Sequence, residues 1–396
     1  MHENKKLEKE KDMAKMNTKK SLMLLLDGAV LPTETDFLEL QEPLIVNPNP
    51  TVEEYDRISG KLGTKDTYAD TCHTVFTETV SHKMRQQDSA QTTLNATPEY
   101  AELLKIGGFE YDVTSETLVL TDASAVTLGE TITGDTSSAS GTVIKIDTTN
   151  DIITLNAVTG APFAIGGEAL NTASYTSTSA GYSPTFKNTQ TPSRGSAKIY
   201  LDGKRYNLTD TLVADNTLTF EIGKAGVISS AMSGFIDNNG IAVDEANPAV
   251  TLSDEPCMLV SCLDVITAGG TALTADTITI TTNADIQEFY ALNLKEFSMQ
   301  DYVMKIQADF YVDSANYADA MTKINAQTVE AIDIKLGTNA TGSLINGKSV
   351  HITADLAKAS AVTDSDDKNA VKRSFTWILN LDSQDTAILI KNGFFA

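Results

Sequence analysis

Apolar residues between positions 113 and 182 alternate with Thr, Ser and Gly and show no helical spacing. Val143–Ile146 and Ile152–Leu155 are clear examples, and turn residues recur at roughly eight to twelve positions. A period of two is typical of strands that bury one face. The segment is therefore predicted to be a small all-β domain, inserted before a strand that resumes at Ala197.

The rest of the chain consists mainly of short Val, Ile and Leu runs bounded by turn residues, which favour strands. Two turns carry the hairpin dipeptides Asp202-Gly203 and Asn346-Gly347. The passage from Gly234 to Pro256 contains Pro, Asn and Gly, and it is predicted to be a long loop. Strands are predicted at residues 71–80, 198–206, 216–222, 258–266, 277–282, 289–294, 303–311, 328–336, 350–354 and 375–381.

Two short amphipathic helices are predicted among the strands. The first begins at Thr97-Pro98, a good N-cap followed by the residue favoured at the first helical position. Gly107-Gly108 should end it after roughly ten residues. The second helix covers residues 314–326, is capped by Asp313 or Ser314, and has its apolar residues on one face.

Both halves of the chain have a similar order of strand, short helix and strand pairs, which predicts an internal duplication. We expect a mainly β fold of sandwich or barrel domains, each with one short helix. The first domain comprises residues 21–112 and 183–250, the inserted β domain residues 113–182, and the second domain residues 251–396. Residues 1–20 hold seven lysines against four acidic residues and form either a charged arm or a solvated tail.

The composition limits the classes of function. The chain has 53 acidic and 30 basic residues, a net charge of -23, which argues against a protein that grips nucleic acid by its phosphates. It does not argue against one that DNA slides past. Cys72, Cys257 and Cys262 are too scattered for a disulfide framework, and we expect core thiols of a protein made in a reducing cytoplasm. Leu22–Leu26 is too short for a membrane span or a signal peptide, so neither is expected.

The motifs that could carry chemistry are all incomplete. Gly129–Gly134 has the glycine spacing of a phosphate loop, but Asp135 stands where a lysine is required, so both glycines are interpreted as turn residues. Three aspartates within residues 364–367 begin like a calcium loop but lack its glycine and its final glutamate. His73 and His82 are expected on the polar surface. The sequence therefore predicts no catalytic, cofactor-binding or metal-binding residue, and a protein that is not an enzyme.

Three segments carry motifs in a characteristic order. Glu54–Gly63 contains an R-x-x-G-x-x-G pattern, Thr97–Phe109 a P-x-x-x-x-L-L-x-x-x-G-F pattern, and Ala197–Lys204 an L-D-G hairpin. Together they resemble the major tail (tail tube) proteins of long-tailed bacteriophages. The resemblance covers roughly residues 30–110 and 195–380, and it does not include the inserted β domain.

The resemblance implies a structural protein of the virion, made in the host cytoplasm, whose rings stack into a tube. Strands of neighbouring subunits would join in an inner barrel, an acidic channel through which double-stranded DNA passes during ejection without specific binding. The implied partners are further copies of the chain, the tape measure protein and other tail proteins, with no membrane. The duplication predicts a trimeric ring; the alternative is a hexamer with the second domain outside.

Other classes remain alternatives at the level of sequence. The chain could be another β protein of the virion, such as a decoration, baseplate or adhesin module. It could also be a secreted carbohydrate-binding or surface-layer protein, although a sugar platform normally uses aromatic residues and these make up only 7% of the chain.

Overall fold

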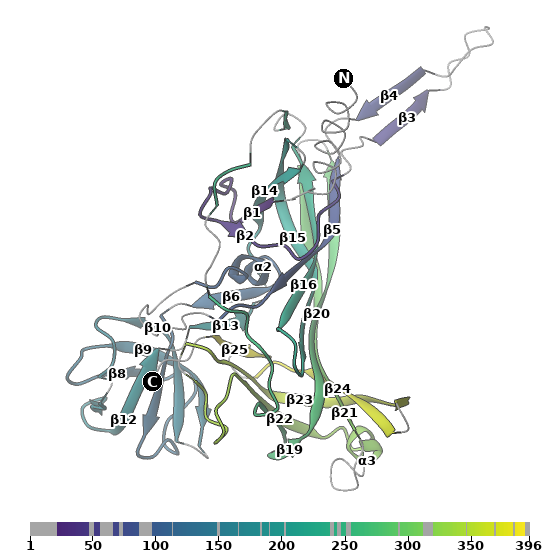
Figure 1. Cartoon of the computed structure of the whole chain (residues 1–396). Coiled ribbons are helices and arrows are strands. Elements are labelled where there is room, and N and C mark those ends of the chain that lie inside the picture. The colour runs from purple at the N-terminus through teal and green to yellow at the C-terminus, as the bar shows by residue number, and fades with distance from the viewer. Residues whose placement is uncertain are drawn as a thin grey trace, which may run out of the picture.

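The computed structural model is mainly β, as predicted, and elongated, with a large sheet, a smaller sheet and a projecting hairpin (Figure 1). The large sheet is nearly closed and barrel-like. The structure describes residues 22–46, 51–55, 66–70, 74–86, 97–112, 114–148, 151–164, 166–182, 184–189, 191–201, 203–237, 241–243, 247–250, 255–291, 294–311, 320–345, 347–367, 370–382 and 385–392. The predicted arm of residues 1–20 lies outside the described residues.

The large sheet joins strands from both ends of the chain. In chain order its strands are β1 (Leu22–Asp27), β2 (Phe37–Leu38), β5 (Val75–Lys83), β6 (Phe109–Asp112), β13 (Thr185–Asn188), β14 (Gly195–Leu201), β15 (Lys204–Glu221), β16 (Val227–Ile236), β17 (Ala242–Val243), β18 (Val265–Ala268), β19 (Thr271–Leu273), β20 (Ala275–Ala291), β21 (Leu294–Tyr311), β22 (Val329–Leu336), β23 (Val350–Asp367), β24 (Ala370–Leu379) and β25 (Leu389–Asn392).

The smaller sheet is built entirely from the predicted insertion. Its strands are ordered β11-β12-β7-β10-β9-β8, and one hydrophobic cluster between Leu118 and Ala180 fills it. Its two ends lie close together, because β6 pairs with β13 and Asp112 is the register partner of Thr185. The strands are β7 (Glu116–Leu120), β8 (Thr131–Thr133), β9 (Ser140–Asp147), β10 (Ile152–Thr159), β11 (Ala169–Leu170) and β12 (Tyr175–Tyr182).

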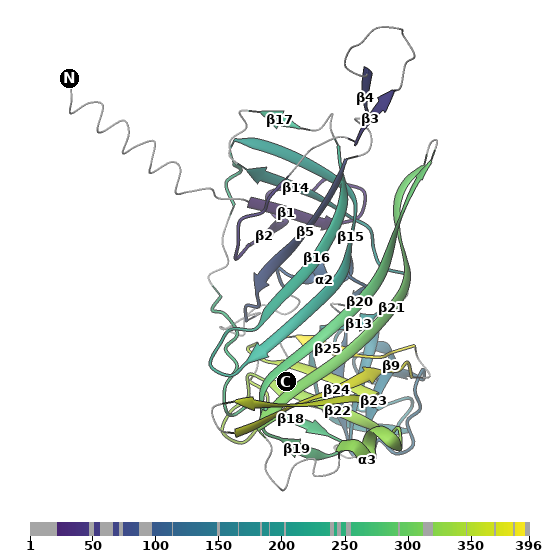
Figure 2. The ribbon, with the colours of Figure 1, turned by 90° about the vertical axis from the view of Figure 1, so that its right-hand side faces the viewer.

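Two hairpins extend away from the sheets (Figure 2). The first pairs β3 (Thr51–Tyr55) with β4 (Asp66–Asp70) and projects beyond the end of β5. The second is the long antiparallel pair β20–β21, whose outer part continues past the neighbouring strands. This hairpin contacts β16 through Phe297, which stacks on Phe235 with the ring centroids 4.4 Å apart.

The predicted boundary at residues 250/251 coincides with no break in the large sheet. β15 pairs with β20 from Asp215↔Asn283 to Glu221↔Thr277, so hydrogen bonds join strands from both predicted domains. The largest hydrophobic cluster likewise draws on both sides, from Met84 to Ile390. A second cluster lies between Met23 and Ile236. The division into two tube domains stays a prediction.

The first helix is shorter than the sequence predicts. α2 covers only Ala101–Lys105, and its N-cap position is Tyr100, without a side-chain capping bond, so the cap assigned to Thr97 is wrong. The physical reason is tertiary: the buried Tyr100 ring packs beside Phe186, with centroids 6.2 Å apart. This packing fixes the chain before the helix begins. The predicted end is confirmed, since Gly108 adopts φ 95° just after it.

The second helix, α3 (Ala320–Asn325), lies within the predicted range of residues 314–326, whose first six residues are outside the described residues. Several strands are longer than predicted. The strand expected at 289–294 is instead the end of the β20–β21 hairpin. Part of the loop expected from Gly234 to Pro256 is in β16, which includes Gly234. A Cβ atom at Gly234 would lie only 2.5 Å from Thr211 Cγ2, so glycine leaves room for the Thr211 side chain of the neighbouring strand.

Candidate functional site

One face of the large sheet is covered with small hydroxyl side chains. It runs across seven consecutive neighbours, β5–β16–β15–β20–β21–β24–β23, and uses alternate residues of each strand. We call it the hydroxyl face. Its Ser and Thr residues are Thr77, Thr79, Ser81, Thr217, Thr219, Ser229, Ser233, Thr277, Thr279, Thr281, Thr363, Ser365, Ser374 and Thr376.

The strand register brings these residues together from distant parts of the sequence. Ser81 pairs with Ser229, Ser229 with Thr217, and Thr217 with Thr281. The Ser81 and Ser229 hydroxyls are 3.0 Å apart and hydrogen-bonded. Residues paired across neighbouring strands share a face, so the row forms one continuous strip of hydroxyl groups.

The opposite face of the same strands is buried. Ile228, Leu218, Ile280 and Ile306 alternate with the hydroxyl positions, and each is 0% exposed. This side holds the core, whereas the hydroxyl face is half-buried or exposed in the single chain. The alternation therefore fixes which side of the sheet is available for function.

Charged groups on the hydroxyl face are mixed. Carboxylates Asp215 and Asp309 lie among lysines such as Lys305, and Lys372 Nζ is held 2.8 Å from Asp276 Oδ2. This ion pair raises the pKa of Lys372, first through its hydrogen bond. The further charged positions of the face are Glu221, Asp285 and Asp301, and Lys83 and Lys358. The face is thus mainly neutral hydroxyl, and the acidity of the chain is not concentrated on it.

β5 forms an open edge on one side of this sheet. Thr74 O accepts a hydrogen bond from Ile236 N at 2.8 Å, so even-numbered residues direct their backbone groups toward β16. Odd-numbered residues direct theirs outward. Ser81 O accepts from Gln41 N at 3.0 Å, but at Val75, Thr77 and Thr79 no other described strand pairs with the outward edge.

β23 forms the open edge on the other side. Its first part, residues 350–358, pairs with β22; residues 350–353 also pair with β25, and the pairing with β24 begins at Ala357. From Ser360 to Asp367 it pairs with β24 alone among the described strands. Among the described strands, the seven-stranded wall therefore ends in two different open edges, β5 at one end and β23 at the other.

The sequence candidates for chemistry lie elsewhere and do not come together. His82 is 1% exposed, so the expectation of a surface histidine is wrong; its Nδ1 is 2.8 Å from Glu39 O, and burial lowers its pKa. His73 is outside the described residues. Gly129 has φ 79° in a turn, and Gly134 begins the next turn, where its carbonyl oxygen accepts a hydrogen bond from Ser138 N at 3.0 Å, so the interpretation of both glycines as turn residues is confirmed.

The remaining candidates have structural partners. Asp364 is hydrogen-bonded to Arg373 at 2.6 Å within the β23–β24 hairpin. Cys257 is half-buried and Cys262 is exposed, so the expectation of a core thiol is wrong for Cys262. Cys262 lies in a turn, because the strand predicted at residues 258–266 begins only at Val265, in β18. Cys72 is outside the described residues. In the described part of the chain, no group of three or more His, Cys, Asp or Glu side chains is placed to hold a metal ion.

No protein-family model matches this chain, and no curated protein matches it. Of the helices that the structure describes, none has the length and apolar character needed to cross a membrane. Sequence patterns alone did not identify the hydroxyl face, although Thr277–Thr282 shows the alternation that forms it. The missing information was the pairing of distant strands.

Proposed function

We propose that the chain is the structural subunit of a bacteriophage tail tube, and that the hydroxyl face lines its channel. The observation that carries the proposal is a seven-stranded wall with two different open edges. An exposed edge is a template for pairing with another chain, and folded proteins normally cover it. Contacts between two different surfaces of identical chains generate rings when the rotation closes.

The chemistry of the hydroxyl face supports passage of DNA without binding. Each lysine that contacts a phosphate adds affinity and salt dependence. Here the lysines are few and interleaved with carboxylates, and Lys372 is already paired with Asp276. Neutral hydroxyls exchange hydrogen bonds with water, so a sliding duplex would meet no strong anchor. Strands of both halves of the chain lie in the wall, which favours a trimeric ring over a hexamer with its second half outside.

The first test is assembly of the purified protein. Negative-stain electron microscopy should show stacked rings or tubes with a central channel, and end-on averaging should show three chains in each ring. A protein that stays monomeric across concentrations and salt conditions would contradict the tube function. Six chains per ring would contradict the trimer and leave the tube.

We expect the substitution Thr79→Pro to abolish assembly and to leave the fold intact. Proline removes an N–H that faces outward and is tolerated on edge strands at such positions. The matched control is Thr79→Val, which retains the N–H and should assemble like the wild type. Circular dichroism reports the fold and electron microscopy the tubes. Normal tubes from the proline variant would show that β5 is not the joining edge.

Replacing residues 114–181 with a short Gly/Ser linker should leave tube assembly intact. The two cut ends are adjacent, because β6 and β13 pair beside them, and the removed strands contribute nothing to the seven-stranded wall. Microscopy of the deletion protein should show tubes of the same inner diameter with thinner outlines. A deletion protein that is soluble and folded but forms no tubes would contradict this prediction.

A further inference from the structure

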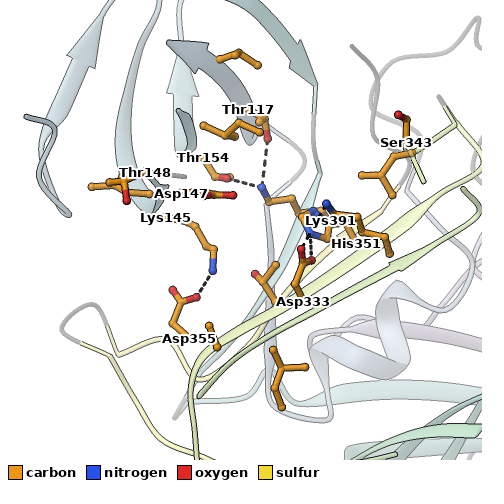
Figure 3. Close-up of a pocket in the computed structure, with 18 of the residues that line it drawn as sticks. Thr117, Lys145, Asp147, Thr148, Thr154, Asp333, Ser343, His351, Asp355 and Lys391 are labelled. Atoms are coloured by element: carbon orange, nitrogen blue, oxygen red, sulfur yellow. Dashed lines mark hydrogen bonds and ion pairs between the residues drawn. The ribbon is translucent and has the colours of Figure 1, made fainter. Parts of the chain in front are cut away.

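A cavity of about 600 Å³ lies between the inserted sheet and the large sheet (Figure 3). β7, β9 and β10 line it on one side, and β22, β23 and β25 on the other. This volume is in the range that holds small molecules. The inserted sheet thus does more than cover the outside of the chain: together with the large sheet it forms the walls of a pocket that is open on one side.

Lys391 is the central charged group of this cavity. Its residue is 4% exposed, and its Nζ donates to Thr154 Oγ1 at 2.5 Å and to Thr117 Oγ1 at 3.5 Å (Figure 3). Both partners are neutral, and no carboxylate oxygen of a described residue lies within 4.0 Å of this nitrogen. A buried ammonium without a counter-ion is strongly disfavoured.

The other basic side chains that line the cavity are each paired with a carboxylate. His351 Nε2 lies 2.5 Å from Asp333 Oδ1, and Lys335 Nζ lies 3.5 Å from Asp333 Oδ2. Lys145 of β9 forms an ion pair with Asp355 of β23 across the cavity. Of the basic side chains that line the cavity, Lys391 is therefore the one with no described carboxylate within 4.0 Å, and Asp147, Asp333 and Asp355 act on it only from a longer distance.

A second polar group of the cavity is also without a partner. Thr353 is 6% exposed, and no described group hydrogen-bonds its hydroxyl. Lys391 is the register partner of His351, and Thr353 lies two residues further along β23, so Thr353 and Lys391 share a face as diagonal neighbours. A ligand oxygen bound by Lys391 can also satisfy this hydroxyl.

We propose that the cavity binds a small molecule through a single carboxylate group, with Lys391 as its counter-ion. One negative charge matches the one unpaired ammonium. A doubly charged phosphate would meet the carboxylates of Asp147, Asp333 and Asp355, which line the same cavity. The hydroxyls of Thr117, Thr154 and Thr353 suit a ligand that carries further oxygens.

The site should bind more tightly at low pH. The pKa of Lys391 is lowered to about 7, mainly by burial and also by the charge of Lys145, while Asp333, Asp147 and Asp355 act in the opposite direction. His351, whose pKa burial also lowers, and Lys335 are the other titratable groups that line the cavity. Binding of a carboxylate needs the ammonium form, so affinity should fall roughly tenfold for each pH unit above 7.

The test is isothermal titration calorimetry of the full chain with sodium glucuronate, sodium acetate, glucose and inorganic phosphate at pH 6 and pH 9. Saturable binding of glucuronate at pH 6, one per chain, with none of glucose or phosphate, is expected. Binding of acetate as well would identify the carboxylate alone as sufficient; binding of glucuronate only would identify an acidic sugar. Lys391→Met should weaken binding at least tenfold, whereas Lys224→Met, a change at an exposed lysine, should not.

Three results would overturn the proposal: no saturable binding of either carboxylate up to about 10 mM, unchanged binding by Lys391→Met, or equal affinities at pH 6 and pH 9. The comparison of binding at pH 6 and pH 9 uses the unaltered protein, so it tests the proposal even if the Lys391→Met variant does not fold. The outcome is independent of tube assembly, which is measured by microscopy.

Discussion

Replacing Trp377 with alanine should lower the free energy of unfolding by about 3 to 5 kcal/mol. The indole is 0% exposed and packs against Phe375, with ring centroids 4.6 Å apart. Its Nε1 donates to Glu330 Oε2 at 3.2 Å, so the change leaves a cavity and also removes a donor from a buried carboxylate. Urea unfolding monitored by circular dichroism measures the loss of stability, and this signal, unlike tryptophan fluorescence, remains usable when the single tryptophan is removed.

A second variant at Trp377 separates these causes, and a variant at an exposed residue serves as a control. Trp377→Phe keeps most of the volume and loses the N–H, and it should cost less than the alanine change. Val371→Ala, at a residue 49% exposed on the same strand, should change the free energy of unfolding by at most about 0.5 kcal/mol. Equal stabilities of the alanine variant and the wild type would show that Trp377 is not a core residue.

Replacing Glu116 with glutamine should stabilise the inserted sheet at pH 8 but not at pH 4. Glu116 is 2% exposed and accepts a backbone hydrogen bond from Phe163 N at 3.2 Å. Burial raises the pKa of Glu116 to about 7; the Phe163 bond opposes this shift and the charge of Glu168 adds to it. Between about pH 4.5, the ordinary pKa of this carboxyl group, and about pH 7, Glu116 therefore keeps its proton in the folded state and has lost it in the unfolded state.

The stability of the inserted sheet should thus fall as pH rises through this window, and the full cost applies above pH 7. Glutamine abolishes the charge, so the expected gain at pH 8 is on the order of 2 kcal/mol, allowing for some solvent screening. Hydrogen exchange of residues 116–182, read by mass spectrometry, measures it. A wild-type sheet whose protection is independent of pH between 4 and 8 would contradict the assignment.

Glu168 provides a control, because its pKa is shifted in the opposite direction from that of Glu116. Burial alone would raise its pKa, but hydrogen bonds from Ala164, Ser137 and Thr136 outweigh it, so the pKa of Glu168 is lowered. Its stabilising effect is present at neutral pH and lost in acid. Glu168→Gln should therefore destabilise the same sheet at pH 8, while Glu116→Gln stabilises it.

Local sequence patterns predicted the elements better than their extents. Alternation identified the strand of residues 277–282, and the Asp202-Gly203 dipeptide identified the β14–β15 hairpin, where Leu201 pairs with Lys204. The full length of β15 and β20 could not be predicted, because their central parts are stabilised by neighbouring strands and not by local propensity. The cap at Thr97 failed for a similar reason, since packing of Tyr100 positions the chain there.

The candidate sites depended even more on distant pairing. Ser81, Ser229 and Thr281 are unremarkable as single residues and become a strip only through three strand pairs. One feature of the sequence does relate to Lys391: it directly follows the apolar run Ala387–Ile390. A lysine at the end of such a run is usually exposed, whereas here the inserted sheet covers it and accepts its hydrogen bonds through Thr117 and Thr154.

From the pairing of β6 with β13 we also expect an order of events in folding. These strands are separated by the whole inserted sheet, and closing so long a loop in an unfolded chain has an entropic cost that increases by about 0.6 kcal/mol for each doubling of loop length. Once the inserted sheet has formed, β12 pairs with β7, with Tyr182 opposite Glu116, and this holds Asp112 and Thr185 near each other. The inserted sheet would then act as an intramolecular template: its early formation shortens the effective loop, and the rate at which the large sheet closes follows the rate at which the small one folds.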